Sequence, residues 1–257
     1  MPELITTLDE FEEEYSKGIG TALPSRGSKE ASLDNIRRFG DGVGDYNPLW
    51  RNEEYAAKSR FQSITAPPMF IYGVSLGISA AINGTIDWRR TSSAHFPMNY
   101  AGGEIKFVRP IWRGDTIRAQ ETVIGIERKQ SDRIGEFCIC KALVEYFNNR
   151  NELVATKKTN MARYKNLGGG RTMQYDRETK TNVSVTSPDP LVFERSRRGS
   201  EPRKWDDVVE GEAIPTLPKG TYTVTELFLY YTRSRGYGPQ SSTSTRGRGF
   251  LRSRRWR

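Results

Sequence analysis

The stretch Gly42–Gly73 reads GVGDYNPLWRNEEYAAKSRFQSITAPPMFIYG, and the rest of the chain is arranged around it. Near its start, Asp45 stands between Gly44 and the pair Asn47-Pro48. Glycine, asparagine and proline are all turn formers, each for its own backbone reason. The sequence therefore predicts that the Asp45 carboxylate lies on a tight loop rather than inside a helix or strand.

After this loop, residues 53–61 place alanine and aromatic side chains on one possible helical face, with charges between them. Pro67-Pro68 then ends the short helix and begins an apolar run over residues 69–82, which predicts a central helix. Gly73 and Gly77 lie four residues apart on that helix, where the absence of a side chain allows another group to approach closely.

Outside this stretch, the hydrophobic period changes from helical to strand-like. Before it, amphipathic helices are predicted over residues 6–17 and from Ser32 onward, with Ser32 or Asp34 as the N-cap. After it, alternation predicts strands over residues 104–109, 115–128, 135–146 and 152–164. The second strand is expected to contain a bulge, because its alternation moves from Ala119 to Thr122. An antiparallel sheet following one buried helix is an α+β arrangement.

The run GDYNPLW, followed by EEYA and SRF, resembles the signature of the MaoC-like, or hydratase-2 type, acyl-CoA dehydratases. That signature reads roughly G-D-x-N-P-L-H, then a short alanine-containing helix, then a His-Gly pair that opens the central helix. Asp45, Asn47, Pro48 and Leu49 match it. The resemblance implies a hot-dog fold, in which an antiparallel sheet wraps around a central helix.

The same resemblance implies chemistry on enoyl or 3-hydroxyacyl thioesters, with coenzyme A as part of the substrate and with neither a separate cofactor nor a metal. In the family, the aspartate and the histidine activate the water that is added or removed. Here Trp50 occupies the histidine position, and tryptophan has no group that titrates near neutrality. Pro67-Pro68 lies near the His-Gly position, and proline has no N–H to donate to the thioester oxygen.

The candidate site therefore contains one catalytic residue, Asp45, whose alternative role is to cap its own turn. The candidate substrate-binding residues are Asn47, Trp50, Tyr55, Gly73 and Gly77. Each has a purely structural alternative: a turn for Asn47, ordinary core packing for the two aromatics, and close helix–sheet packing for the glycines. His95 is the only histidine and is expected in a loop. Arg113 is a candidate contact for the phosphates of coenzyme A.

Two functions remain open at this point. One is an acyl-CoA hydratase or dehydratase that uses Asp45. The other is a non-catalytic hot-dog subunit that binds acyl thioesters or a catalytic partner. Both imply a homodimer or a pairing with another hot-dog protein.

The net charge of +9 comes mainly from one segment, because residues 241–257 contain six arginines and no acid. We expect this tail to be disordered, with nucleic-acid binding as a less favoured alternative. The predicted organisation is a hot-dog domain over residues 1–165, a linker over 166–204, a truncated start of a second hot dog over 205–240, and the tail. Cys138 and Cys140 would share one face of a strand as core thiols. We expect no membrane span and a cytoplasmic location.

Overall fold

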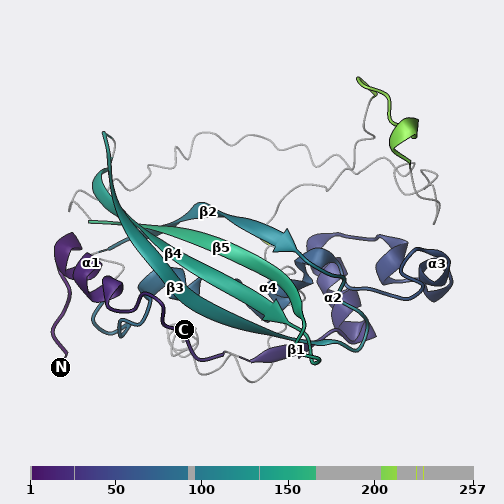
Figure 1. Cartoon of the computed structure of the whole chain (residues 1–257), viewed down its shortest axis with the longest axis horizontal. Helices are drawn as coiled ribbons and strands as arrows, with labels where there is room; N and C mark the ends of the chain where they lie inside the picture. The colour runs from purple at the N-terminus through teal and green to yellow at the C-terminus, as the bar shows by residue number, and fades with distance from the viewer. Residues whose placement is uncertain are drawn as a thin grey trace, which may run out of the picture.

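The computed structural model describes residues 2–25, 27–91, 96–132, 134–165, 204–212, 224 and 228. Its main element is a five-stranded antiparallel sheet in the order β1-β3-β4-β5-β2 (Figure 1). The strands are β1 (Ser28–Glu30), β2 (Met98–Phe107), β3 (Thr116–Ser131), β4 (Gly135–Phe147) and β5 (Leu153–Tyr164). The three long central strands form a meander, while β1 and β2 are its two edges. The sequence predicted β3 to β5 and the second half of β2, whose predicted start was residue 104, but it predicted no strand at β1.

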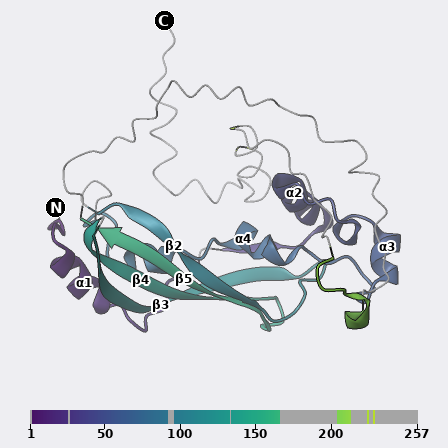
Figure 2. The ribbon, with the colours of Figure 1, turned by 90° about the horizontal axis from the view of Figure 1, so that it is seen from above.

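Within residues 2–165, the described α-helices are α1 (Leu8–Ser16), α2 (Leu33–Val43), α3 (Glu53–Lys58), α4 (Ile71–Val74) and α5 (Ser79–Asn83). Seen from above, α4 lies on one face of the sheet, α1 lies at one end, and α2 and α3 lie at the other (Figure 2). Helix α2 begins as predicted, because the Ser32 hydroxyl accepts a hydrogen bond from Asn35 N. It ends at Gly44, whose left-handed backbone suits glycine.

The sheet follows the predicted alternation most closely in β4, where every second side chain is buried. Cys138 and Cys140 are fully buried on the same face, which confirms the prediction for both thiols. The following turn is held by Asn148, whose side-chain oxygen accepts from Arg150 N and Glu152 N. The hot-dog arrangement of a curled sheet over central helical segments is therefore present.

The bulge in β3 is real, but the sequence placed it too early. Inward alternation continues through Glu121 and Val123, and the register shifts between Val123 and Gly125. Thr122 and Ile124 consequently lie on the opposite face, and Ile124 is exposed. The prediction failed because the inward-facing residue between Ala119 and Val123 is Glu121, a charged residue that interrupts the apolar alternation of the strand.

The predicted single helix over residues 69–82 is wrong in form, because the structure breaks it into two short helices. A 3-10 turn, Pro68–Phe70, leads into α4. The chain then becomes extended at Ser75 (φ −152°) and left-handed at Gly77 (φ +59°) before α5 begins. Both halves are nevertheless central, since Phe70, Ile71, Ala80 and Ala81 are fully buried.

Inward-facing side chains of the sheet satisfy the backbone groups that this break leaves free. The Tyr146 hydroxyl donates to Ser75 O at 3.0 Å, Lys157 Nζ to Leu76 O at 2.6 Å, and Thr159 Oγ1 to Gly77 O at 2.7 Å. On the neighbouring strand, the Glu121 carboxylate accepts from Ser75 Oγ at 3.0 Å and from Ala80 N at 2.9 Å. Buried backbone polar groups need such partners. The break is therefore specified by residues distant in the sequence.

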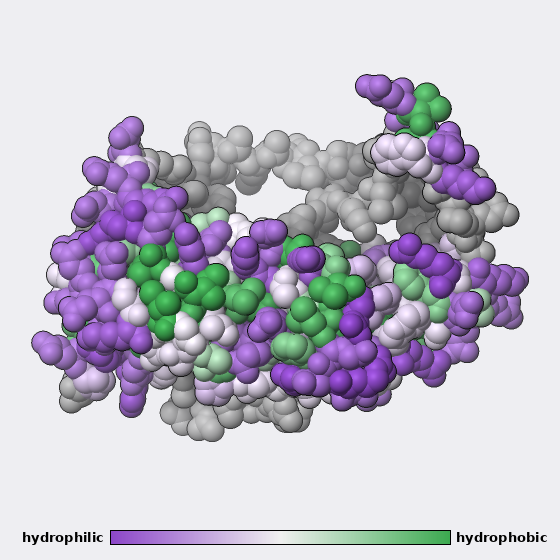
Figure 3. Space-filling model, in the orientation of Figure 1, coloured by the Kyte–Doolittle hydropathy of each residue, from purple (hydrophilic) through white to green (hydrophobic). Residues whose placement is uncertain are grey.

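This polar network lies between two apolar clusters. One, at the α2 end, includes Phe39, Trp50 and Phe70, and the other, at the α1 end, includes Phe11 and Phe96. The opposite face of the sheet, which points toward the viewer in Figure 1, carries apolar areas between polar borders (Figure 3). Within the described ranges, none of the helices has the length and apolar character needed to cross a membrane.

The predicted tail over residues 241–257 lies outside the described residues, as do nearly all of the predicted linker and most of the segment over 205–240. Within that segment, Trp205–Asp207 forms a single 3-10 turn.

Candidate functional site

The motif loop folds around the Asp45 side chain. One carboxylate oxygen accepts from Asn47 N at 3.1 Å, and the other accepts from the Trp50 indole N–H at 2.9 Å. Asn47 in turn caps the 3-10 turn Pro48–Trp50 by accepting from Leu49 N. Both Asp45 oxygens are thus used in ordering the loop, as expected of an aspartate in a turn. Trp50 is 8% exposed and fixes the far end of this arrangement.

A cleft of about 260 Å³ opens beside Trp50. Its walls come from the motif loop, the segment between α3 and α4, the end of β2 with the residues that follow it, and the start of β5. The lining residues are Trp50, Arg60, Phe61, Thr65, Ala66, Pro68, Phe107, Val108, Arg109, Pro110, Ile111 and Val154. Mostly apolar walls with a few polar groups are typical of small-molecule sites.

Of the six predicted site residues, only Trp50 lines this cleft. Asp45 is connected to the cleft through its hydrogen bond to the Trp50 indole. Asn47 is exposed on the loop and Tyr55 is half-buried on α3. Gly73 lies within α4, whereas Gly77 lies in the break. His95 lies outside the described residues.

Gly77 has a clear packing role. A methyl group added at this position would come within 2.6 Å of Val144 Cγ2 and 3.0 Å of the Tyr146 hydroxyl oxygen. The space beside Gly77 is therefore filled by side chains of the sheet. This agrees with close helix–sheet packing, the structural role that the sequence offered as an alternative to substrate binding.

The sequence did not predict the charged rim of the cleft. Arg60 lies over the Phe61 ring at 4.7 Å, and Phe61 meets Trp112 edge to face at 6.1 Å. Arg109 instead pairs with Glu152 at 2.5 Å. Hydrogen bonds from Asn148 and Arg109 lower the pKa of Glu152 to about 2. Among the ion pairs of the described residues, none involves Arg60, so its guanidinium is available to an anionic ligand. The adjacent Arg60-Phe61 pair is a basic–aromatic signal that the sequence did contain.

The predicted phosphate contact, Arg113, does not line the cleft. Its guanidinium pairs with Glu53 Oε1 on α3 at 2.7 Å.

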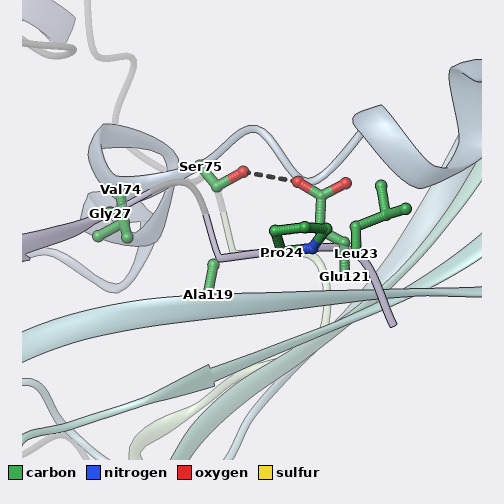
Figure 4. A pocket seen from close by; sticks show the side chains of 7 residues that line it. All are labelled: Leu23, Pro24, Gly27, Val74, Ser75, Ala119 and Glu121. Atoms are coloured by element: carbon green, nitrogen blue, oxygen red, sulfur yellow. Dashed lines mark hydrogen bonds between the residues drawn. The ribbon is translucent and has the colours of Figure 1, made fainter. Parts of the chain in front are cut away.

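A second and much smaller cavity, of about 10 Å³, lies beside the break in the central segment. Figure 4 shows the Ser75 hydroxyl pointing toward the Glu121 carboxylate, with Leu23 and Pro24 of the loop before β1 alongside. This volume is close to the minimum for a single water molecule. The cavity is too small to hold a substrate.

Lys157 is the most perturbed cationic side chain near the central segment. It is 2% exposed, and burial lowers the pKa of its amine from 10.5 to about 8, an effect that Glu121 partly opposes. Burial penalises the charged form of an amine, which explains the direction.

We expect this shift to appear in the pH dependence of stability. Between about pH 8 and 10.5 the unfolded chain keeps a proton on Lys157 that the folded chain has lost, so the free energy of unfolding rises with pH in that window. Urea denaturation at several pH values checks this by comparing wild type with Lys157→Met. The free energy of unfolding of wild type should rise relative to that of Lys157→Met as the pH rises. Lys158→Met, on the opposite face of the same strand, should track wild type, and a difference that stays constant with pH would contradict the assignment.

Comparison with known proteins places the chain in a family. The model of the FAS1-like dehydratase domain region matches residues 18–157. A probable enoyl-CoA hydratase alpha subunit from Thermomonospora curvata is 22% identical over 201 residues, which cover 74% of this chain and 63% of that protein. A UPF0336 protein from Saccharopolyspora erythraea is 25% identical over 143 residues, covering 56% of this chain and 86% of that protein.

Among solved structures, the ChsH1-ChsH2 complex from Mycobacterium tuberculosis contains a chain similar in fold. It superposes with a TM-score of 0.51 at 14% identity, covering 64% of this chain and 96% of that one. Because the family match spans more than half of its residues, the chain belongs to the FAS1-like dehydratase-region family, a group of MaoC-like hot-dog dehydratases.

Proposed function

We propose that this chain is an acyl-thioester-binding hot-dog subunit that acts with a histidine-bearing partner, rather than a self-sufficient hydratase. The observation that carries the proposal is the hydrogen bond from the Trp50 indole to Asp45. In the family pattern a histidine occupies this position and exchanges a proton with water. The indole N–H can donate to the carboxylate, but it cannot take up or release a proton near neutral pH.

The cleft supports the binding half of this proposal. Trp50, Phe61, Phe107 and Val108 give it apolar walls suited to an acyl chain, and Arg60 supplies a positive charge at its rim. Coenzyme A thioesters combine these two properties, because an apolar acyl group is joined to a polyanionic nucleotide.

The edge of the sheet supports the pairing half. Within the described residues, β2 is hydrogen-bonded to no strand other than β5, so its other edge is not paired with a strand. Tyr100 and Phe107 on β2 are exposed. An edge strand of this kind is a template for strand addition. A second hot dog that extended the sheet at β2 would lie beside the cleft, since Phe107 ends β2 and also lines the cleft. Consistent with such pairing, one relative is described as an alpha subunit and one similar structure is a two-protein complex.

A binding and turnover experiment tests the proposal. Crotonyl-CoA titrated into the purified chain should bind by calorimetry, whereas absorbance of the conjugated thioester should show no hydration. Asp45→Asn should bind crotonyl-CoA as wild type does. Turnover by wild type that Asp45→Asn abolishes would establish an independent hydratase, and absence of binding would reject the proposal altogether. The cytoplasmic location remains a prediction.

Arg60 at the rim and Arg113 outside the cleft allow a matched comparison. Replacing Arg60 with alanine should weaken crotonyl-CoA binding about tenfold, because a charge-assisted hydrogen bond to a phosphate is lost. Arg113→Ala removes an arginine that is already paired with Glu53 and should leave the affinity unchanged. Equal losses of crotonyl-CoA affinity in the two variants would show that binding depends on the overall positive charge of the surface and not on an arginine at the cleft.

A further inference from the structure

The amine of Lys157 lies where the central segment breaks. Its side chain comes from the inward face of β5 and donates to Leu76 O, just after α4. The rings of Tyr72 on α4 and Tyr100 on β2 cover the amine, with their centroids at 4.7 and 5.6 Å. A lysine enclosed in this way is uncommon, because buried ammonium groups need compensating partners.

The segment that Lys157 holds is also a wall of the cleft. The 3-10 turn Pro68–Phe70 continues directly into α4, and Pro68 lines the cleft at one end of this piece. Leu76, at the other end, is bonded to Lys157. Phe70 and Ile71 are fully buried between the two ends, so the piece is packed as a unit. Lys157 itself is three residues from Val154, another lining residue, on the same strand.

We propose that Lys157 is a positioning residue for the acyl-thioester cleft: its amine fixes the end of α4 through the Leu76 carbonyl and thereby sets the position of the Pro68 wall. The inference rests on the proposed function, and Lys157 itself does not touch the ligand. A protonated amine makes a shorter and stronger bond to a carbonyl than a neutral amine does. The position of the wall therefore depends on the charge of Lys157.

This dependence falls within an accessible pH range. The ionisable groups around the amine are Tyr72 and Tyr100, whose rings cover it, and Glu121, whose charge acts on it. The Tyr146 hydroxyl donates to Ser75 O, the carbonyl of the residue before Leu76. Burial raises the pKa of Tyr146, which stays neutral, while burial lowers the pKa of Lys157 to about 8. Between pH 7 and 9 the amine passes from mostly charged to mostly neutral, and its hold on Leu76 weakens.

Crotonyl-CoA binding measured by calorimetry from pH 7 to pH 9 tests the inference. We expect the affinity of wild type to fall about fivefold over this range, the difference between a charge-assisted and a neutral hydrogen bond. Lys157→Met should bind more weakly at pH 7 and show no pH dependence. Lys158→Met serves as the matched control, because this lysine faces the opposite side of the sheet, and it should reproduce the wild-type profile.

The outcomes separate the two proposals. If wild type binds no crotonyl-CoA at any pH, the proposed function fails. If it binds with a flat profile, or if Lys157→Met keeps the wild-type profile, the positioning role is overturned. Should Lys157→Met not fold, amide exchange in wild type gives an independent answer. After correction for intrinsic rates, the amides of residues 74–78 should exchange faster at pH 9 than at pH 7, and unchanged protection would refute the role.

Discussion

Replacing Arg163 with methionine is expected to destabilise the fold by about 3–5 kcal/mol, because it leaves buried carbonyl groups without donors. Arg163 is 2% exposed, and its guanidinium donates to Phe96 O at 2.8 Å and to Ile82 O at 2.9 and 3.1 Å. A further bond reaches the Asn83 side chain, and the Phe11 ring lies below at 5.5 Å. Among the described residues, no carboxylate forms an ion pair with Arg163. Its buried charge is therefore stabilised by these neutral acceptors.

Urea denaturation of the variant measures this effect, and the exposed Arg113 provides the control. Arg113→Ala loses only a surface ion pair with Glu53, which is worth at most about 1 kcal/mol. If the free energies of unfolding of Arg163→Met and wild type differed by less than about 1 kcal/mol, the carbonyls at the end of α5 would have found other partners. The role assigned to Arg163 would then be incorrect.

Alanine at position 77 is the second substitution with a large expected effect. Gly77 has a left-handed backbone (φ +59°), which disfavours any side chain, and the new methyl group would meet Val144 Cγ2 at 2.6 Å. Backbone strain and overpacking together should lower the free energy of unfolding by about 2–4 kcal/mol.

The matched control is Gly125→Ala in β3. A methyl group there has no atom within 4 Å and requires no left-handed conformation, so the change in stability should stay within about 0.5 kcal/mol. Equal stability of the Gly77 and Gly125 variants, measured in the same denaturation series, would mean that the break can move to accept a side chain.

The tryptophan in the motif is hydrogen-bonded to the motif aspartate but brings different chemistry from a histidine. The Trp50 indole supplies an N–H donor to Asp45, so these two motif positions are joined by a hydrogen bond. What disappears is the second, titratable nitrogen that an imidazole has and an indole lacks. The result is an ordered loop in which an indole, and not an imidazole, is hydrogen-bonded to Asp45.

Much of the fold could be predicted from local signals. Ser32 marked the start of α2, the Pro67-Pro68 pair marked the start of the central segment, and alternation located β4 to within a residue or two. These signals act over a few neighbouring residues, so they can be read from the sequence alone.

The break in the central segment could not be predicted in the same way. It lies in an apolar run that contains no proline after Pro68, and an isolated serine or glycine does not by itself end a helix. The groups that stabilise the break, Glu121, Lys157 and Thr159, belong to strands that come much later in the chain. The cleft was missed for a similar reason, because Arg60, Arg109 and Val154 meet only after the sheet has formed.

The strand order has a consequence for synthesis on the ribosome. Strand β2 ends at Phe107, but its partner β5 begins only at Leu153. The nascent chain must therefore present an unpaired strand while β3 and β4 are being made, although those two can close as a local hairpin. Non-local pairing delays folding and exposes strand edges to misassembly, so we infer that the edge of β2 is most open to misassembly in the interval before β5 emerges.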